Sequence, residues 1–488
     1  MKNIFKFIFA CLLVTVTSCN DAIDITQPGR LGAENAFRSV TDLQSGLLGA
    51  YNFLDTTFEI GFTSAMTDEC YRGRDNGGQN TNEQNFNINT SNGYANGIWS
   101  GYYGAIGMAN RVIEAATTID RNEDPTAYDN IVGQAYAIRA FSHFQILTWF
   151  STDYTDDNAL AGLLLTGVTQ DIFAQVPRST NGEFYAQITE DLNVASNLIT
   201  SNASVKFMGQ DFITALRARM HAYKGDYAAA ATYAQDILDN YSVSNATQFT
   251  AMFEDADFTE VIFSLERSIG DSYDGQGTAG GGWAGSLYAF IDATEQGGPF
   301  MEMSRSVYNI LAGTSDVRLS RSLNVAESII DPGYESNDNF INDDVLLVYK
   351  YPGGVQPLLN DLKVFRATEM HLILAEAAAD AGDYAQAGTL VNQLRGLRDA
   401  STLDLPTNEA DAFGMILDER RLEFLFEGHR WVDLKRLGDR GNRAMDRDAR
   451  ECSFLADCTL PNDDYRFTLP IPVAEITANG AAQQNPNY

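Results

Sequence analysis

Acidic and basic side chains alternate along residues 418–438, and this stretch holds the strongest candidates for chemistry in the chain. Glu419 and Asp433 stand among several arginines, and His429 lies between them in sequence. A histidine beside carboxylates can transfer protons, because its ordinary pKa lies near neutral pH. Apolar residues three and four positions apart instead indicate a half-buried helix tied to its neighbours by ion pairs. We favour this structural interpretation, with Gly428 ending a helix or admitting a close backbone.

Other catalytic motifs are absent from the sequence. It has no G-x-S-x-G elbow, no Walker loop and no H-E-x-x-H. The histidines stand singly in expected helices, so we expect packing roles rather than metal ligation. They are His143, His221, His371 and His429. A glycosidase needs only two well-placed carboxylates, and the 65 acidic residues leave that alternative open.

Two clusters of Asp and Asn, at 153–158 and 337–344, offer the hard oxygen ligands that calcium prefers. Neither follows the helix-flanked calcium loop of twelve residues, so solvated loops are the favoured interpretation. No Cys and His spacing suits zinc. We therefore expect no metal and no cofactor, with calcium as the alternative.

The N-terminus has the layout of an export signal. Two lysines precede an apolar run over 7–16, which is too short to span a membrane. Two small residues then precede Cys19, the order of a bacterial lipobox. We expect a lipoprotein signal peptide over 1–18, a lipidated tether over 19–28 and one domain over 29–488. An ordinary signal peptide is the alternative; acyl chains, palmitate among them, on Cys19 would anchor the protein firmly.

The charge and the remaining cysteines bound the partners and the compartment. The chain has 33 Lys and Arg against 65 Asp and Glu, a net charge of −32. Such a charge repels nucleic acids and anionic lipids, so we expect no nucleic acid, membrane contact through the lipid anchor only, and a neutral ligand. Cys452 and Cys458 close a short loop in an exported chain, which makes a disulfide plausible. Cys70 is then a buried thiol.

Most of the chain predicts helices separated by long polar loops. Helical spacing of apolar residues is clear over 96–116, 134–150 and 183–199. The motif Gly-Asp-Tyr-Ala-x-Ala occurs at Gly225 and again at Gly382. Each glycine can end one helix in a left-handed turn, and the following aspartate can cap the next. The sequence therefore predicts a mostly α fold with about four tetratricopeptide-like hairpins and a few short strands.

Three loop regions have a different composition. Residues 72–96 are rich in Asn, Gly and Gln, residues 268–299 in Gly and aromatics, and residues 324–357 in Asn and Asp with a strand-like 345–350. Long loops on a rigid scaffold usually carry binding residues. Exposed aromatic rings beside amides and carboxylates suit sugars, which present apolar faces and hydroxyls. Trp283 lies in a glycine-rich run, as a ligand platform or as a loop residue packed on the core.

Several longer motifs carry a family resemblance over essentially the whole mature length. They include Trp99-Ser-Gly-Tyr-Tyr103, Glu260-Val-Ile-Phe263, Phe365-Arg-Ala-Thr-Glu-Met370, Glu419-Arg-Arg-Leu-Glu-Phe424, Gly428-x-Arg-Trp431 and Leu469-Pro-Ile-Pro472. Together with the Cys19 lipobox, these motifs resemble the SusD/RagB family of Bacteroidetes outer-membrane lipoproteins. The charged 418–438 stretch is the strongest of these markers.

The resemblance implies a surface lipoprotein of the outer membrane that binds glycan without cutting it. It implies as partner a SusC-like TonB-dependent transporter, to which the captured oligosaccharide or polysaccharide is delivered. Asp68 and Arg366 match family positions near the ligand face, and their opposite charges make a pair possible. Loop composition adds further candidate ligand-binding residues: Arg72, Arg74, Tyr273, Trp283 and Tyr288. A surface glycoside hydrolase and a peptide-capturing relative of the same fold are the alternative functions.

Overall fold

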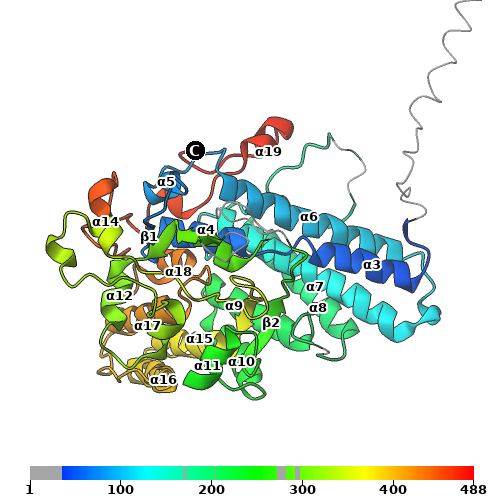
Figure 1. The fold of residues 1–488 in the computed structure, drawn as a ribbon. Helices are drawn as coiled ribbons and strands as arrows, with labels where there is room; N and C mark the ends of the chain where they lie inside the picture. The colour runs from blue at the N-terminus through cyan, green and yellow to red at the C-terminus, as the bar shows by residue number, and fades with distance from the viewer. Residues whose placement is uncertain (1–35, 169–170, 172, 203, 272–281, 292–296) are drawn as a thin grey trace, which may run out of the picture.

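The computed structural model of the chain is dominated by helices, with a few short strands in the connections (Figure 1). It describes residues 36–168, 171, 173–202, 204–271, 282–291 and 297–488. The expected signal peptide, Cys19 and the tether lie outside the described residues. Among the described helices, none is both long and apolar enough to cross a bilayer. The predicted mostly α fold is confirmed.

Helix α7 (Pro125–Phe150) is the centre of the N-terminal half (Figure 1). Its residues are buried almost continuously after its first turns, as expected for a helix that is apolar on every side. α6 (Gly93–Ala116) and α8 (Asn181–Leu198) both pack against α7. α3 (Val40–Tyr51) covers α6 and α7. α6, α7 and α8 correspond to the three segments with clear helical spacing in the sequence.

The first Gly-Asp-Tyr motif forms the predicted hairpin. α9 (Gln210–Lys224) ends at Gly225, which has a φ of 82° in the left-handed region. Asp226 then caps α10 (Tyr227–Leu238), because its side chain accepts a hydrogen bond from the Ala229 amide. Glycine is favoured at such a position since a Cβ would be strained there. The predicted turn is confirmed.

The second motif repeats this geometry. α15 (Ala367–Asp380) precedes Gly382, which also has a φ of 82°, and Asp383 caps α16 (Tyr384–Leu397). α10 packs against α15, so the two hairpins stack although about 130 residues separate them in sequence. This stacking is the tetratricopeptide-like arrangement that the repeat predicts.

The charged stretch 418–438 forms two helices joined by a turn, and not one continuous helix. α17 (Glu409–Glu423) ends before the turn, and α18 (Arg430–Leu437) follows it. Gly428 lies in the turn with a φ of 85°. A Cβ on Gly428 would lie 3.3 Å from the backbone nitrogen of Ile60. Gly428 therefore both reverses the chain and admits another backbone.

The strands form three antiparallel pairs within the described residues. β1 (Cys70–Arg72) pairs with β5 (Met301–Met303), β2 (Val261–Leu265) with β6 (Leu362–Arg366), and β3 (Ala289–Ile291) with β4 (Gly297–Pro299). The strand expected at 345–350 is wrong, because Val345 and Val348 form only isolated bridges. Shorter helices complete the connections: α4 (Thr57–Met66), α5 (Thr81–Gln84), α11 (Ala246–Met252), α12 (Arg305–Leu311), α13 (Val317–Ser322), α14 (Phe340–Asp343) and α19 (Val473–Ala478).

Candidate ligand-binding site

Arg72 is the last residue of β1, and Arg74 lies on the exposed turn that follows. Gly73 between them is held against the edge of β5, where its amide donates to the Phe300 carbonyl at 3.1 Å. A Cβ on Gly73 would lie 2.5 Å from the Pro299 carbonyl oxygen, so only glycine fits without a shift. This close approach aims both arginine side chains toward solvent.

Glu302 fixes the base of the same turn. Its buried carboxylate accepts hydrogen bonds from the Arg74 amide at 2.6 Å and from the Leu346 amide at 3.0 Å. Burial raises the pKa of Glu302 to about 7. Nothing in the sequence singles out this residue, a lone acid between two methionines. Its role depends on a backbone amide that is 228 positions away in sequence.

The two guanidinium groups are weakly engaged by the protein. Arg74 Nε lies 3.8 Å from Asp75 Oδ1, and both side chains are largely exposed. Such exposed pairs stabilise a fold by about 0–1 kcal/mol. Arg72 has no ion pair among the described residues. The turn therefore presents two cations that remain available for hydrogen bonds to a ligand.

The possible pair of Asp68 with Arg366 does not form, because both side chains are buried with other partners. The Asp68 carboxylate is completely buried and lies 2.7 Å from Arg430 and 3.2 Å from Arg421. Burial alone would raise the pKa of Asp68, but Arg421 and Arg430 hold it well below its usual range. Both arginines come from the charged 418–438 stretch, which is adjacent in space although distant in sequence.

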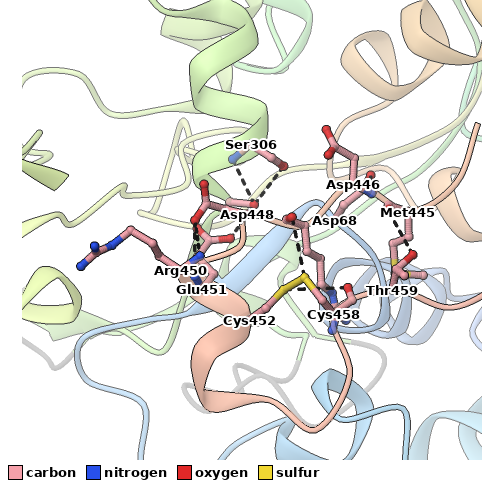
Figure 2. The surroundings of a disulfide bond; sticks show 12 residues. Asp68, Ser306, Met445, Asp446, Asp448, Arg450, Glu451, Cys452, Cys458 and Thr459 are labelled. Atoms are coloured by element: carbon pink, nitrogen blue, oxygen red, sulfur yellow. Dashed lines mark hydrogen bonds between the residues drawn. A yellow bond between two sulfur atoms is a disulfide. The ribbon is translucent and has the colours of Figure 1, made fainter. Parts of the chain in front are cut away.

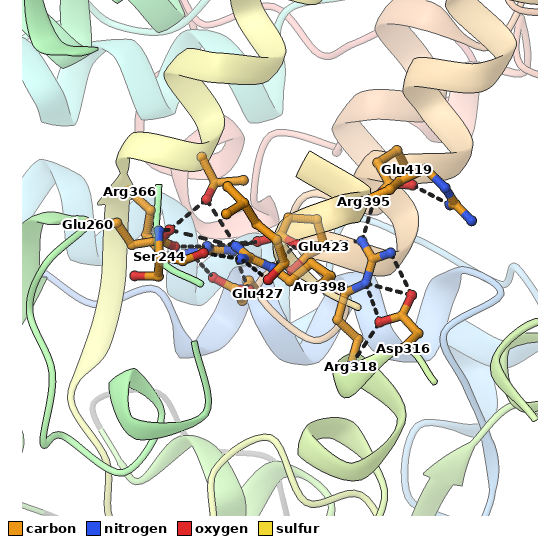
Figure 3. A network of polar contacts seen from close by, with 12 residues as sticks. Ser244, Glu260, Asp316, Arg318, Arg366, Arg395, Arg398, Glu419, Glu423 and Glu427 are labelled. Atoms are coloured by element: carbon orange, nitrogen blue, oxygen red, sulfur yellow. Dashed lines mark hydrogen bonds and ion pairs between the residues drawn. The ribbon is translucent and has the colours of Figure 1, made fainter. Parts of the chain in front are cut away.

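Arg366 is likewise buried, inside a network of ion pairs (Figure 3). Its guanidinium lies 3.0 Å from both Glu423 and Glu427 and also pairs with Glu260. Arg398 contacts Glu423 at 2.8 Å. The network joins five cations to five carboxylates: Arg318, Arg366, Arg395, Arg398 and Lys350 with Asp316, Glu260, Glu419, Glu423 and Glu427. This balance of charge makes it a structural brace and not a ligand site.

The aromatic candidates of the 268–299 loop are also inside the protein. Trp283 is 6% exposed, and its indole nitrogen donates to the Ser268 carbonyl. The ring of Tyr288 packs against Phe426, and its hydroxyl lies 3.0 Å from Ser64 Oγ. Both rings are therefore covered in the structure, which supports the packed-loop interpretation of Trp283, and contact of Trp283 or Tyr288 with a ligand stays a prediction. Tyr273 lies outside the described residues.

His429 is half-buried. Burial lowers its pKa to about 3, and its ring stacks on Phe424 with centroids 4.4 Å apart. His143 is similar, since burial lowers its pKa to about 3 as well. These geometries support the structural interpretation of both histidines. Among the described residues, no group of three or more His, Cys, Asp or Glu side chains is arranged to hold a metal ion.

Cys452 and Cys458 form a disulfide, with Cα atoms 5.1 Å apart (Figure 2). Cys70 is a buried free thiol. Next to the disulfide loop, Arg447 donates to the Met66 and Thr67 carbonyls at 2.9 and 3.0 Å, at the end of α4. Sequence analysis missed this role of Arg447, because no local motif identifies an arginine that caps a distant helix.

Two hollows of comparable size open on the described surface. One, of about 500 Å³, lies among residues 152–155, 222–227 and 435–440. On its wall, Lys435 Nζ donates to the Ser151 carbonyl at 2.6 Å and to Thr468 Oγ1 at 3.0 Å, and burial lowers its pKa to about 7. The other hollow, of about 520 Å³, lies beside the end of α3.

The fold and the loop cations together define a class: a helical scaffold whose connections carry an exposed turn with two arginines. Comparison with known proteins narrows this class. Residues 348–488 match the model of the SusD family, and residues 40–212 match a model described as starch-binding associating with outer membrane. The N-terminal and C-terminal parts of the chain are thus each similar to SusD-type proteins.

Relatives cover nearly the whole chain. SusD-like protein P2 of Formosa agariphila is 27% identical, with 99% of each chain covered. A SusD superfamily protein of Bacteroides thetaiotaomicron has a similar structure, with a TM-score of 0.76, 22% identity, and coverage of 92% of this chain and 100% of that one. A protein described as laminarin-binding and SusD-like has a TM-score of 0.68 and 19% identity, with 93% and 100% covered.

Proposed function

We propose that this protein is a lipid-anchored, surface-exposed lipoprotein of the outer membrane that captures glycan and passes it, uncut, to a SusC-like TonB-dependent transporter. The observation that carries the binding role is the turn with Arg72 and Arg74. It is braced by Glu302 and Gly73, yet its guanidinium groups are left exposed. A rigid backbone with free donors loses little conformational freedom when a ligand binds.

The similarity to SusD-type proteins and the buried ion pairs of the core support the remaining parts of this proposal. One matching family model is named for starch binding and outer-membrane association, and one structural relative is described as laminarin-binding. The carboxylates of the charged network are held by arginines in the interior, where no polysaccharide could reach them. The net charge of −32 favours a neutral glycan over a polyanion. Cys19 provides the anchor.

Affinity electrophoresis of the purified mature protein tests the proposal. The gels would contain laminarin, amylopectin or galactomannan as neutral probes and alginate as an acidic one. We expect at least one neutral probe to retard the protein without any release of reducing ends. Released reducing ends would instead identify a glycoside hydrolase. Retardation by alginate alone would overturn the neutral assignment.

A double variant links binding to the turn. Arg72→Ala with Arg74→Ala should weaken retardation strongly, whereas Arg111→Ala, an exposed arginine on α6, should not. Equal retardation of the two variants would place the ligand elsewhere. Capture of peptides and no retardation by any polysaccharide would favour the peptide-binding alternative.

A further inference from the structure

A groove lies beside the loop 52–56, which joins α3 to α4. It combines two neighbouring pockets, one of about 520 Å³ and a narrower one of about 140 Å³. Asn52 lines both parts. We name it the Asn52 groove, and its walls include Tyr51, Asn52, Phe53, Phe58, Phe207 and Arg267.

Helix α6 forms the floor of the narrow part with glycines. The Phe53 ring lies on Gly104, where a Cβ would be 2.5 Å from the ring, and the Phe58 ring lies on Gly97 in the same way. Gly101 is between them, and a Cβ there would meet its nearest atom, the Phe53 carbonyl oxygen, at 3.7 Å. The result is a slot with two phenyl walls and a backbone floor.

Large apolar side chains are exposed around the groove. Leu48 is 48% exposed, Phe53 42%, Phe207 39% and Ile269 65%. Phe207 is held in place by Tyr51, whose ring meets it edge to face with centroids 5.4 Å apart. An exposed apolar cluster of this kind marks a contact surface more often than chance exposure does.

The charged groups of the groove are paired with one another. Arg267 Nη2 lies 2.7 Å from Asp55 Oδ1, and Lys206 pairs with Glu266. These pairs leave the walls without a free cation for an anionic ligand among the described residues. The side-chain amide of Asn52 has no partner among them either, so it can both donate and accept. Apolar ring faces beside a free amide suit a neutral, hydroxyl-rich ligand.

We propose that the Asn52 groove is a second glycan-contacting site, separate from the turn with Arg72 and Arg74. Phe53, Phe58 and Phe207 contact the apolar faces of sugar rings, and the Asn52 amide binds hydroxyls. The groove lies at the start of α4 and the arginine turn follows its end. Ten residues of helix place them about 15 Å apart or more. This inference rests on the proposed glycan capture, since it names a further contact for the same ligand class.

A slot-filling variant tests the groove without removing any wall. Gly101→Leu would project a side chain between the two phenyl walls, and leucine favours the helix more than glycine does. Gly107→Leu is the matched control, because it lies on the same helix and a Cβ there meets nothing within 4 Å. We expect Gly101→Leu to raise the dissociation constant for the retained neutral polysaccharide roughly five- to tenfold, and Gly107→Leu to leave it unchanged.

A second pair of variants distinguishes a loss of binding from a folding defect. Phe207→Ala should weaken binding by a similar factor, whereas Phe258→Ala, with the same 39% exposure but outside the groove, should not. Circular dichroism and thermal melting of each variant verify the fold. All four variants use the full mature chain, with laminarin, amylopectin and galactomannan as probes.

The outcomes separate this inference from the proposed function. Lost binding in Arg72→Ala with Arg74→Ala, combined with unchanged binding in Gly101→Leu and Phe207→Ala, overturns the groove and leaves glycan capture intact. A wild type that binds no polysaccharide overturns both. Concentration-dependent self-association that Gly101→Leu abolishes, with glycan binding unchanged, would make the groove a protein contact and also overturn the inference.

Discussion

The buried arginines around Glu423 and the exposed arginines of the 72–74 turn differ in what surrounds them, and not in residue type. Arg366 and Arg398 are 2% exposed or less and lie about 3 Å from carboxylates of the same chain. Arg72 and Arg74 are exposed, and the Asp75 carboxylate lies 3.8 Å from the Arg74 guanidinium. The first pair is committed to the fold, whereas the second remains available to a ligand.

This difference assigns two functions to one kind of side chain. Removing two charges from water is expensive, so a buried pair is tolerated only when its partners are well placed. Such a network specifies how helices and strands meet. A solvated guanidinium needs no partner from the protein and adds little to stability. Substitutions in the buried network should therefore change stability, whereas substitutions of the exposed arginines should change binding.

The largest expected effect is on stability, from Glu423→Gln. The Glu423 carboxylate lies 3.5 Å or less from Arg318, Arg366 and Arg398. Burial would raise its pKa, but Arg398 and Arg366 hold it below the ordinary range, so the group is ionised at neutral pH. Neutralising it leaves buried cations short of a partner, which should lower the free energy of unfolding by about 3–5 kcal/mol.

Urea denaturation at pH 7 measures this change. Glu190→Gln, an exposed acid on α8 without an ion pair among the described residues, is the control and should shift stability by less than about 0.5 kcal/mol. Similar small shifts for both variants would break the comparison between buried and exposed charge.

The second prediction concerns pH and a buried carboxyl group that lacks a cation. Burial raises the pKa of Glu59 to about 8, and its Oε2 atom has no hydrogen-bond partner among the described residues. Because the folded-state pKa lies above the ordinary 4.5, this group favours folding below about pH 4.5. That contribution is lost as the pH rises toward 8.

Glu59→Gln should therefore flatten the decline of unfolding free energy between pH 5 and 8, by about one proton in the linkage slope. The contribution of Asp433 to stability has the opposite pH dependence. Burial would raise its pKa, but Arg420 and Arg436 lower it to about 2, so its contribution is lost only as the pH falls through that range. Parallel stability curves for wild type and Glu59→Gln would contradict the prediction.

The third prediction addresses backbone strain in the repeated hairpin. Gly382 has a φ of 82°, and a Cβ there would meet nothing within 4 Å. Gly382→Ala should therefore lower stability by about 1–2 kcal/mol through backbone conformation alone. Gly107→Ala, inside α6 and also free of contacts, should raise it by roughly 0.5–1 kcal/mol. Thermal unfolding of the two variants should shift in opposite directions, and equal shifts would contradict the assigned turn.

The smallest stability effect should accompany a large loss of binding. Arg72→Ala with Arg74→Ala should change the unfolding free energy by less than about 0.5 kcal/mol, because the turn is held by the backbone and Glu302. Calorimetric melting of the double variant, compared with its retardation in polysaccharide gels, sharpens the contrast with Glu423→Gln. A melting shift as large as that of Glu423→Gln would show that the turn also supports the fold.

Local patterns in the sequence predicted the helical scaffold, but they could not predict which charged residues pair across long distances in the sequence. The hairpins at Gly225 and Gly382 follow from a turn glycine and a capping aspartate within a few positions. Asp68 and Arg366 have compatible charges, but each has closer opposite charges from residues 421–430. Sequence alone cannot rank such partners.

The loop aromatics show the same limit. Glycine-rich composition around Trp283 left two interpretations open, a ligand platform or a loop residue packed on the core, because no bulky residue is near it in sequence. The residues that pack on this loop come from elsewhere: Leu358 approaches Gly285, and Phe426 covers Tyr288. The exposed arginines were named from loop composition, and the structure keeps them on the surface. Phe53 and Phe207 had no sequence signal that separates them from core residues.

The bonds from Arg447 to the end of α4 bear on the order in which the chain can fold. Arg447 reaches Thr67 across 380 residues, and Arg430 reaches Asp68 across 362. Contacts of such sequence separation form slowly, since a long loop must close before they stabilise anything. The N-terminal segment is therefore fixed only after the last part of the chain has folded onto it. A chain without its last fifty or so residues would lack the bonds from Arg447 to the end of α4. We therefore expect late, concerted folding of the N-terminal and C-terminal segments.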